Sequence, residues 1–328
     1  AVSQKSDTES AEFLLELMSK DLPLISNKFE INTIFRPYLD SLPLAKTLFP
    51  EILDYSSIEE YKAPIFSMLA KLKAKGMVKT KTYKKYKKQI LNDAKIQLKR
   101  HLGQNANLRG YSRYNNSNKK EAEILENYAQ LLFPFYDEKE MKLFFTRLAL
   151  SKNAALKTTY ASLLAENNRA FPNSLLDSLT AQPKSRGLLF AKLQKIEKTE
   201  LFPKKYRNQK SIAESEVYSK NNYNNNKFKT EFIEEKSIQF KGKLYKGFLY
   251  KLVEERDFNP NKRMFLVVYK DDGKLQSEPF YVSAGFRIKD TDTDEEISRL
   301  VTEQFLLKER KRANIFRPEL NNRYGGYY

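Results

Sequence analysis

The segment Lys220-Asn-Asn-Tyr-Asn-Asn-Asn-Lys227 separates two parts of the chain whose apolar residues recur with different periods. Upstream, apolar residues recur about every 3.6 positions, as in amphipathic helices. Downstream, Leu244-Tyr-Lys-Gly-Phe-Leu-Tyr-Lys-Leu-Val253 and its neighbours are rich in aromatic and β-branched residues that alternate as in strands. The change predicts a mainly α protein with a smaller β module, joined by a low-complexity linker at 220–229.

The downstream part is predicted to form an antiparallel β meander and a C-terminal helix over residues 230–315. Strands are expected at Ile238–Phe240, Leu244–Val253, Met264–Tyr269 and Phe280–Ile288. Lys241-Gly242 and Asp272-Gly273 stand where hairpin turns require a positive φ. Thr293 is expected to cap the final helix, whose acidic first turn and basic last turn complement the helix dipole. Residues 316–328 are expected to form a loose tail.

The upstream part contains short amphipathic stretches that each predict a helix. They are Ser10–Lys20, Leu44–Asp54, a helix after Ser57, Lys81–Leu102, Lys119–Phe133, Glu138–Leu150, Ala154–Asn167, Ser174–Thr180, Arg186–Lys198 and Ser211–Tyr218. Ser57 and Glu60 fit a capping box, and Gly103 suits the left-handed position after a helix. An Asn-rich linker at 104–118 divides helical regions 1–103 and 119–219. The short joins favour an α-solenoid of antiparallel helical hairpins.

A weak repeat of Phe-Pro pairs supports the solenoid. The pairs are Phe49-Pro50, Phe133-Pro134, Phe171-Pro172 and Phe202-Pro203, and the last two intervals are 38 and 31 residues. Such intervals fall within the range of helical-hairpin repeats. Phe would fill the interface with the preceding hairpin and Pro would begin the next helix, although chance is the alternative in a chain with 22 Phe and 12 Pro. In the regular spacing of its predicted helical hairpins, the helical part, roughly 10–219, resembles a HEAT/armadillo-type α-solenoid.

The excess of Lys, Asn, Tyr and Phe, with a helical array followed by a β module, also resembles the C-terminal part of large Bacteroidota cell-envelope proteins, such as TraB/GumN-like ones. This resemblance implies that any enzymatic site of such a protein lies outside this chain. The polar start Ala1-Val-Ser-Gln4 is expected to follow a removed signal peptide or an upstream domain. We therefore favour an extracytoplasmic location, in the periplasm or at the cell surface. No apolar run approaches the about 20 residues of a transmembrane helix.

Residue types that serve catalytic and cofactor sites are scarce. Cys is absent, which excludes thiolate nucleophiles, disulfides and Cys-based zinc sites. His101, the single histidine, follows Lys99 and Arg100, whose charges disfavour its protonated form. No glycine-rich phosphate loop occurs, and the acidic run Asp290-Thr-Asp-Thr-Asp294 lacks the Gly and Glu of a calcium loop. We expect no cofactor, no metal and no catalytic activity. The remaining alternative is an enzyme that uses carboxylates or hydroxyls, but the pairs Glu234-Glu235 and Glu254-Glu255 are expected on strand edges or turns.

The net charge of +18 is concentrated between Met77 and Lys120, where 13 Lys and Arg accompany a single acid, Asp93. Such a local field attracts nucleic acid, anionic lipid headgroups or acidic proteins. The candidate anion-binding residues are Lys81, Lys84, Lys85, Lys87, Lys88, Lys95, Lys99, Arg100, Arg109 and Arg113. Tyr83, Tyr86, Tyr111 and Tyr114 are interleaved with them, and the last two could stack on bases. The buried stripe of the same helix is expected to be Ile90, Leu91, Ala94, Leu98 and Leu102. The alternative is a solvated helix face.

The sequence thus predicts a non-catalytic protein–protein interaction or scaffolding module, a subunit or fragment of a cell-envelope assembly with protein partners. The alternative function is binding of nucleic acid or an anionic surface through residues 79–113. Steep salt dependence of binding to generic DNA or RNA would favour the alternative. A partner protein that stays bound at high salt would favour the scaffold.

Overall fold

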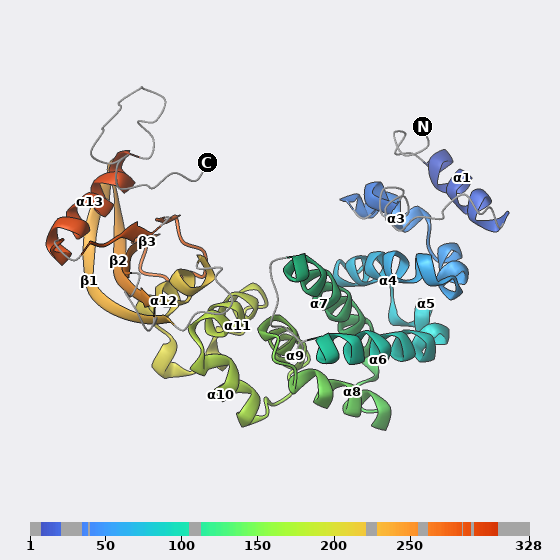
Figure 1. Ribbon diagram of the computed structural model, residues 1–328. Coiled ribbons are helices and arrows are strands. Elements are labelled where there is room, and N and C mark those ends of the chain that lie inside the picture. The colour runs from blue at the N-terminus through green and yellow to red at the C-terminus, as the bar shows by residue number, and fades with distance from the viewer. Residues whose placement is uncertain are drawn as a thin grey trace. The chain divides into compact units, whose positions relative to one another are not determined.

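The computed structural model describes residues 8–20, 35–38, 40–104, 113–220, 228–254, 262–283, 285–289 and 292–307. The protein is mainly α, with a smaller antiparallel sheet and a C-terminal helix, as the sequence predicts (Figure 1). Contacts within the chain define two compact units, Ala1–Leu163 and Leu164–Tyr328. The division falls inside helix α9 (Ala154–Glu166).

The first unit is helical. Its helices are α1 (Thr8–Ser19), α3 (Leu42–Thr47), α4 (Glu59–Ala74), α5 (Thr80–Tyr83), α6 (Lys87–Gln104), α7 (Arg113–Leu132) and α8 (Lys139–Ala149), with 3-10 turns η2 (Glu51–Ser57), η3 (Lys84–Tyr86) and η4 (Phe133–Phe135). Helix α7 packs against both α4 and α6. The buried rings of Phe66 and Tyr128 meet edge to face across α4 and α7, 5.8 Å apart. Aromatic contacts of this kind fix the helices to one another.

Three details of the predicted helices differ. The stretch Leu44–Asp54 is not one helix, because Pro50 cannot donate an N–H into a continuing helix and instead precedes η2. The capping box was wrong: Ile58 is the N-cap residue of α4 and has no side-chain cap bond, while the Ser57 hydroxyl faces the Asp54 carbonyl at 3.5 Å. Gly103 lies inside α6 rather than after its end.

The Phe-Pro pairs share only part of the predicted geometry. The Pro of each pair lies at the start of a helical turn, namely η2, η4, α10 (Asn173–Ala181) and η6 (Lys204–Tyr206). Phe133 and Phe202 are buried, whereas Phe49 and Phe171 are only half-buried. A common role of Phe as an interface plug is therefore not met at all four sites, and the helices fit an α-solenoid only loosely.

The second unit combines helices with a sheet. Besides α10 and η6 it contains α11 (Pro183–Lys195), η5 (Thr199–Leu201), α12 (Gln209–Lys220), β1 (Phe228–Phe240), β2 (Lys243–Glu254), β3 (Lys262–Lys270), β4 (Tyr281–Val282), β5 (Phe286–Arg287) and α13 (Asp294–Leu307). The antiparallel strands lie in the order β1-β2-β3-β4, and β5 also pairs with β3. The predicted antiparallel meander is confirmed, except that the strand expected at Phe280–Ile288 is divided into the two short strands β4 and β5, which both pair with β3.

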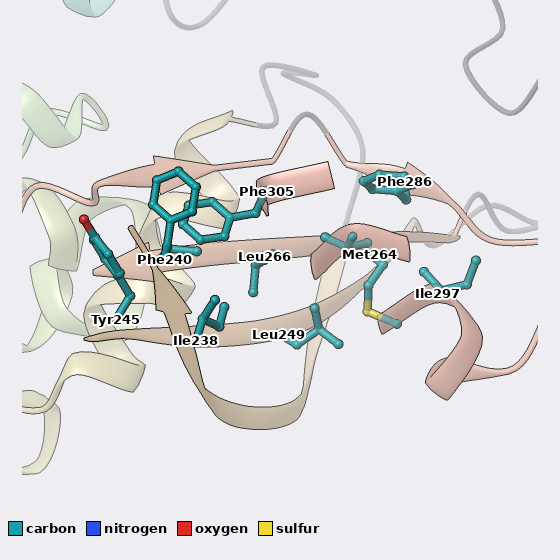
Figure 2. Packing of buried hydrophobic residues seen from close by; sticks show 11 residues of the cluster. Ile238, Phe240, Tyr245, Leu249, Met264, Leu266, Phe286, Ile297 and Phe305 are labelled. Carbon is teal, nitrogen blue, oxygen red and sulfur yellow. The ribbon is translucent and has the colours of Figure 1, made fainter. Parts of the chain in front are cut away.

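A helix covers each face of this sheet. On one face Ile297, Val301 and Phe305 of α13 pack on residues that include Phe240 and Leu266 (Figure 2). On the other face, α12 packs through two small apolar residues. They are Ala213 and Val217, and their partners include Phe248, Tyr250, Phe265 and Tyr269. Sequence analysis grouped α12 with the helical region, but its apolar side belongs to the core of the sheet. A short amphipathic helix does not reveal from its own sequence which surface it covers.

Local turn and cap signals were read correctly. Lys241 and Gly242 both have positive φ, 51° and 72°, as the β1–β2 hairpin requires. Thr293 caps α13, since its Oγ1 accepts a hydrogen bond from the Glu296 N–H at 3.2 Å. Gly273 also has a positive φ, 73°, but it lies in a longer loop between β3 and β4.

The loop between β3 and β4 is held by two glutamine side chains. The Gln194 amide of α11 donates to the Leu275 carbonyl at 2.9 Å and accepts from the Ser277 N–H at 3.1 Å. The Gln209 amide of α12 makes the same paired bonds with the backbone of Gln276, at 2.8 and 2.9 Å. Because a primary amide has the donor and acceptor of a peptide group, the two side chains substitute for a neighbouring strand.

The first strand contains a β-bulge. Phe232 pairs with Tyr250 and Glu234 with Leu249, so Ile233 has no partner on β2. The extra residue reverses the alternation of side chains. Phe232 therefore packs on the α12 side, whereas Ile238 packs on the α13 side.

The predicted domain limits stay predictions. Most of the linkers at 104–118 and 220–229, and the tail at 316–328, lie outside the described residues. Helix α7 begins at Arg113, six residues before the helix start predicted at Lys119.

Candidate anion-binding face

The predicted basic residues lie on three consecutive elements. Lys81 belongs to α5, Lys84 and Lys85 to η3, and Lys87, Lys88, Lys95, Lys99 and Arg100 to α6. The single helix predicted from Lys81 to Leu102 is therefore interrupted by a 3-10 turn. Arg109 lies outside the described residues, and Arg113 begins α7 but its side chain is not described.

Burial of apolar residues decides which side of α6 faces solvent. Ile90, Leu91, Ala94 and Leu98 are buried, at 3% exposure or less, which confirms the predicted stripe at these positions. Leu102 does not belong to it and is 38% exposed, because the stripe ends one turn earlier. Lys84, Lys88, Lys99 and Arg100 are exposed, and Lys87 and Lys95 are half-buried.

The two tyrosines beside the lysines are used inside the fold. Tyr83 is fully buried, donates its hydroxyl to the Leu131 carbonyl at 3.2 Å, and meets the Phe135 ring edge to face. Its burial raises the pKa of the Tyr83 hydroxyl to about 12. Tyr86 is half-buried and donates to the Asp54 carboxylate. Tyr111 and the side chain of Tyr114 lie outside the described part of the chain. Tyr83 is therefore not free to stack on a base, and the hydroxyl of Tyr86 is engaged.

Acidic residues from other elements neutralise part of the basic stretch. Lys85 pairs with Asp54 at 3.3 Å, Lys87 with Glu138 at 2.7 Å, and Lys95 with Glu140 at 3.2 Å. The hydrogen bond from Tyr86, followed by that from Lys85, lowers the pKa of Asp54. These acids lie 31 to 51 residues away from their lysines in the sequence. The local excess of charge seen in the sequence thus overstates the field at this surface.

The remaining basic residues keep their charge unopposed within the described part of the chain. No described acidic side chain forms an ion pair with Lys81, Lys84, Lys88, Lys99 or Arg100. All five are exposed. Sequence analysis treated the lysines as one set, but the structure separates these cations from the three that join helices.

A buried polar cluster that sequence analysis missed lies behind this face. Asp93, 4% exposed, accepts a hydrogen bond from Tyr128 of α7 and lies 3.7 Å from the Lys62 ammonium of α4. Burial acts against the charge of Lys62, yet the hydrogen bond to Glu59 and the charge of Asp93 raise the pKa of Lys62. The cluster ties α4, α6 and α7 together, which is a structural role. The signal in the sequence was Asp93 itself, the one acid in the basic stretch.

His101 is an interhelical residue. It is 1% exposed, and its Nδ1 lies 3.9 Å from a Glu121 carboxylate oxygen of α7. Burial lowers the pKa of His101, with Glu121 acting in the opposite direction. Neither ring nitrogen has a hydrogen-bond partner among the described residues. Burial is the main cause of the lowered pKa, and the adjacent cations Lys99 and Arg100, which the sequence indicated, are not among its causes.

Three of the carboxylates considered from the sequence have structural partners. Asp294 pairs with Lys251 at 2.8 Å, and Asp292 accepts the Lys289 N–H at 2.9 Å. Glu234 accepts a hydrogen bond from the Ser298 hydroxyl, which lowers the pKa of Glu234. Asp290 lies outside the described residues. Within the described segments, no group of three or more His, Asp or Glu side chains could hold a metal ion.

Comparison with known proteins adds no further constraint. No protein-family model, no curated protein and no solved structure matches the chain. Of the helices that the structure describes, none has the length and apolar character needed to cross a bilayer. The HEAT-like and TraB/GumN-like resemblances stay expectations from the sequence.

Proposed function

We propose that the chain is a non-catalytic protein–protein interaction or scaffolding module, as a subunit or fragment of a cell-envelope assembly. The envelope setting rests on the sequence resemblance alone. The interaction role rests on the first unit, whose polar groups mainly hold helices together while some of its large apolar side chains face solvent.

The observation that carries the proposal is an apolar stripe on α8. Leu143 is 51% exposed and Leu150, directly after the helix end, is 75% exposed. Positions seven residues apart lie on the same side of a helix, because seven residues make about two turns. The buried side of α8 is occupied by Met141, Phe144, Phe145 and Leu148. Two exposed leucines on the outer side are typical of a seam that packs against another helix.

The three ion pairs of the basic stretch favour this role over generic phosphate binding. Each pair joins a lysine to an acid on a neighbouring element, so these lysines are not free to neutralise phosphates. Affinity for nucleic acid depends chiefly on the number of phosphates that free cations neutralise. The tyrosine that is fully buried, Tyr83, also leaves the surface without a stacking ring at that position.

The test is co-purification from the native source with the tagged chain, washed at about 1 M salt, where the Debye length is about 3 Å. We expect wild type to retain a stoichiometric partner protein. The double variant Leu143→Asp/Leu150→Asp should lose it, because two charges would enter an apolar seam. A matched control, Leu188→Asp/Leu244→Asp, removes two exposed leucines from the second unit, 38% and 50% exposed, and should retain the partner.

Two results would contradict the proposal. One is retention of the same partner by the Leu143→Asp/Leu150→Asp variant when its circular dichroism spectrum matches wild type. The other is co-purification of nucleic acid alone, released steeply by salt, which would favour the alternative function of residues 79–113.

A further inference from the structure

The exposed side of α6 combines unopposed positive charge with apolar side chains. We call Lys84, Lys88, Ile96, Lys99 and Leu102 the basic ridge. Its three lysines are exposed and form no ion pair with the described acidic residues. Ile96 is 49% exposed and Leu102 is 38% exposed.

The helix brings four of these residues to one side. Lys88, Ile96, Lys99 and Leu102 are spaced by 8, 3 and 3 positions, so at about 100° per residue they fall within about 120° of the helix surface. Lys84 precedes Lys88 by one turn, in η3. The distance along the axis from Lys88 to Leu102 is about 21 Å, the length of four helical turns.

This composition distinguishes the classes of partner. A nucleic acid offers phosphates and bases, but the ridge has no exposed aromatic ring among its members, and the neighbouring Tyr83 is buried. Phosphate contacts would leave Ile96 and Leu102 in water. A partner with acidic and apolar side chains would pair with the lysines and also cover Ile96 and Leu102, since interfaces combine an apolar centre with a charged rim.

We propose that the basic ridge binds an acidic amphipathic helix of a partner protein. Leucine or isoleucine side chains of that helix would pack against Ile96 and Leu102, as ridges and grooves of two helices interlock. Its glutamates or aspartates would pair with Lys84, Lys88 and Lys99. The inference deepens the proposed function and rests on it, but it concerns a different surface from the leucine stripe of α8.

The experiment measures fluorescence anisotropy with the full chain and a labelled helical peptide of about 20 residues, long enough to span the ridge. The first peptide has a leucine stripe flanked by glutamates, and the second has glutamine at every glutamate position. A DNA duplex of about 20 base pairs and vesicles containing phosphatidylserine are the competing probes. Each probe is titrated at two salt concentrations.

The protein variant is Lys84→Gln/Lys88→Gln/Lys99→Gln. Its matched control, Lys184→Gln/Lys204→Gln/Lys243→Gln, removes the same charge from exposed positions of the second unit. We expect the glutamate peptide to bind wild type about tenfold more tightly than the glutamine peptide. The ridge variant should lose about tenfold in affinity for the glutamate peptide, and the control should stay within about twofold.

Three results would overturn the inference. They are no binding of the glutamate peptide to wild type, equal affinity of the ridge variant, and tighter ridge-dependent binding of DNA or vesicles than of the peptide. The co-purification experiment on Leu143 and Leu150 separates the two proposals. The native partner could be lost only when those leucines are changed, while the glutamate peptide does not bind wild type. This pair of results would support the proposed function and would show that the basic ridge has no part in it.

Discussion

The two units hold their elements together by different means. In the first unit, polar groups cross between helices: Asp93 lies buried between Lys62 and Tyr128, and Lys87 reaches Glu138. In the second unit, apolar layers cover both faces of one sheet. Both units also contain fully buried Phe and Tyr rings. Truncating one such ring should therefore destabilise chiefly the unit in which it lies, and the first unit should depend in addition on its buried polar cluster.

The largest effect should follow from truncating the aromatic core of the second unit. Phe305 of α13 is fully buried, and its ring centroid lies 5.1 Å from that of Phe240 and 5.2 Å from that of Tyr281. Figure 2 shows the Phe240 and Phe305 rings side by side. Phe305→Ala should lower the free energy of unfolding by about 3–5 kcal/mol. Hydrogen exchange should show lost protection in β1–β3 and α13, and retained protection in α4, α6 and α7.

Phe145→Ala is the reciprocal variant in the first unit. Phe145 is also fully buried and lies between the rings of Phe133 and Tyr160. Phe145→Ala should reduce the hydrogen-exchange protection of α7 and α8 and leave that of the sheet unchanged. Equal loss of protection in both units for either variant would contradict the distinction between them.

A smaller effect concerns acid. Because burial lowers the pKa of His101, the unfolded chain takes up a proton below pH about 6.5 more readily than the folded one. The stability contributed by neutral His101 is therefore present above that pH and is lost as the pH falls below it. Between about pH 7.5 and 5.5, the range in which histidine titrates, the urea midpoint of His101→Gln should fall less than that of wild type.

The neighbours of His101 set the control for this measurement. Glu121 faces His101 from α7 and opposes the lowering of its pKa. The stability of the Glu121→Gln variant should therefore be more sensitive to acid than that of wild type. Identical pH dependence of wild type and His101→Gln would place the acid sensitivity elsewhere.

The smallest effect should come from the surface ion pairs of the first unit. Lys87→Gln and Lys95→Gln should each lower the free energy of unfolding by about 0–1 kcal/mol, because such pairs lose most of their attraction to solvent screening and side-chain entropy. Lys85 is exposed, and Lys85→Gln should have the smallest effect on the melting temperature. Of the three, Lys87 is the most buried, at 22% side-chain exposure, and should matter most. Thermal melts at low and high salt would measure this. A larger drop in melting temperature for Lys85→Gln than for Lys87→Gln would contradict this order.

Features that local residues determine could be predicted from the sequence. The change in apolar period identified the sheet, and Lys241-Gly242 and Thr293 marked a turn and a cap that depend only on adjacent residues. Burial of Ile90, Leu91, Ala94 and Leu98 followed from helical spacing. These signals are local because backbone dihedral angles and helix periodicity act over a few residues.

Contacts that depend on residues distant in the sequence could not be predicted. The partners of Lys85, Lys87 and Lys95 could not be found from the basic stretch, since Asp54, Glu138 and Glu140 approach only in the folded chain. The half-buried Phe171 and the exposed Leu102 likewise depend on whether a neighbouring element reaches them. For the candidate site, sequence supplied the residues but not their division into paired and unopposed cations.

The bulge at Ile233 has a consequence for how this protein can vary in length. Even-numbered residues of β1 face α12 before the bulge and α13 after it. Deleting Ile233 would remove the bulge and leave every other residue of β1 opposite its present partner on β2, so Ile238 and Phe240 would stay on the α13 side. Deleting a paired residue such as Ser237 would instead move part of the strand to the opposite face. The loss of one residue should therefore be tolerated at Ile233, as it is in connections outside the strands, and selected against at the paired positions of β1.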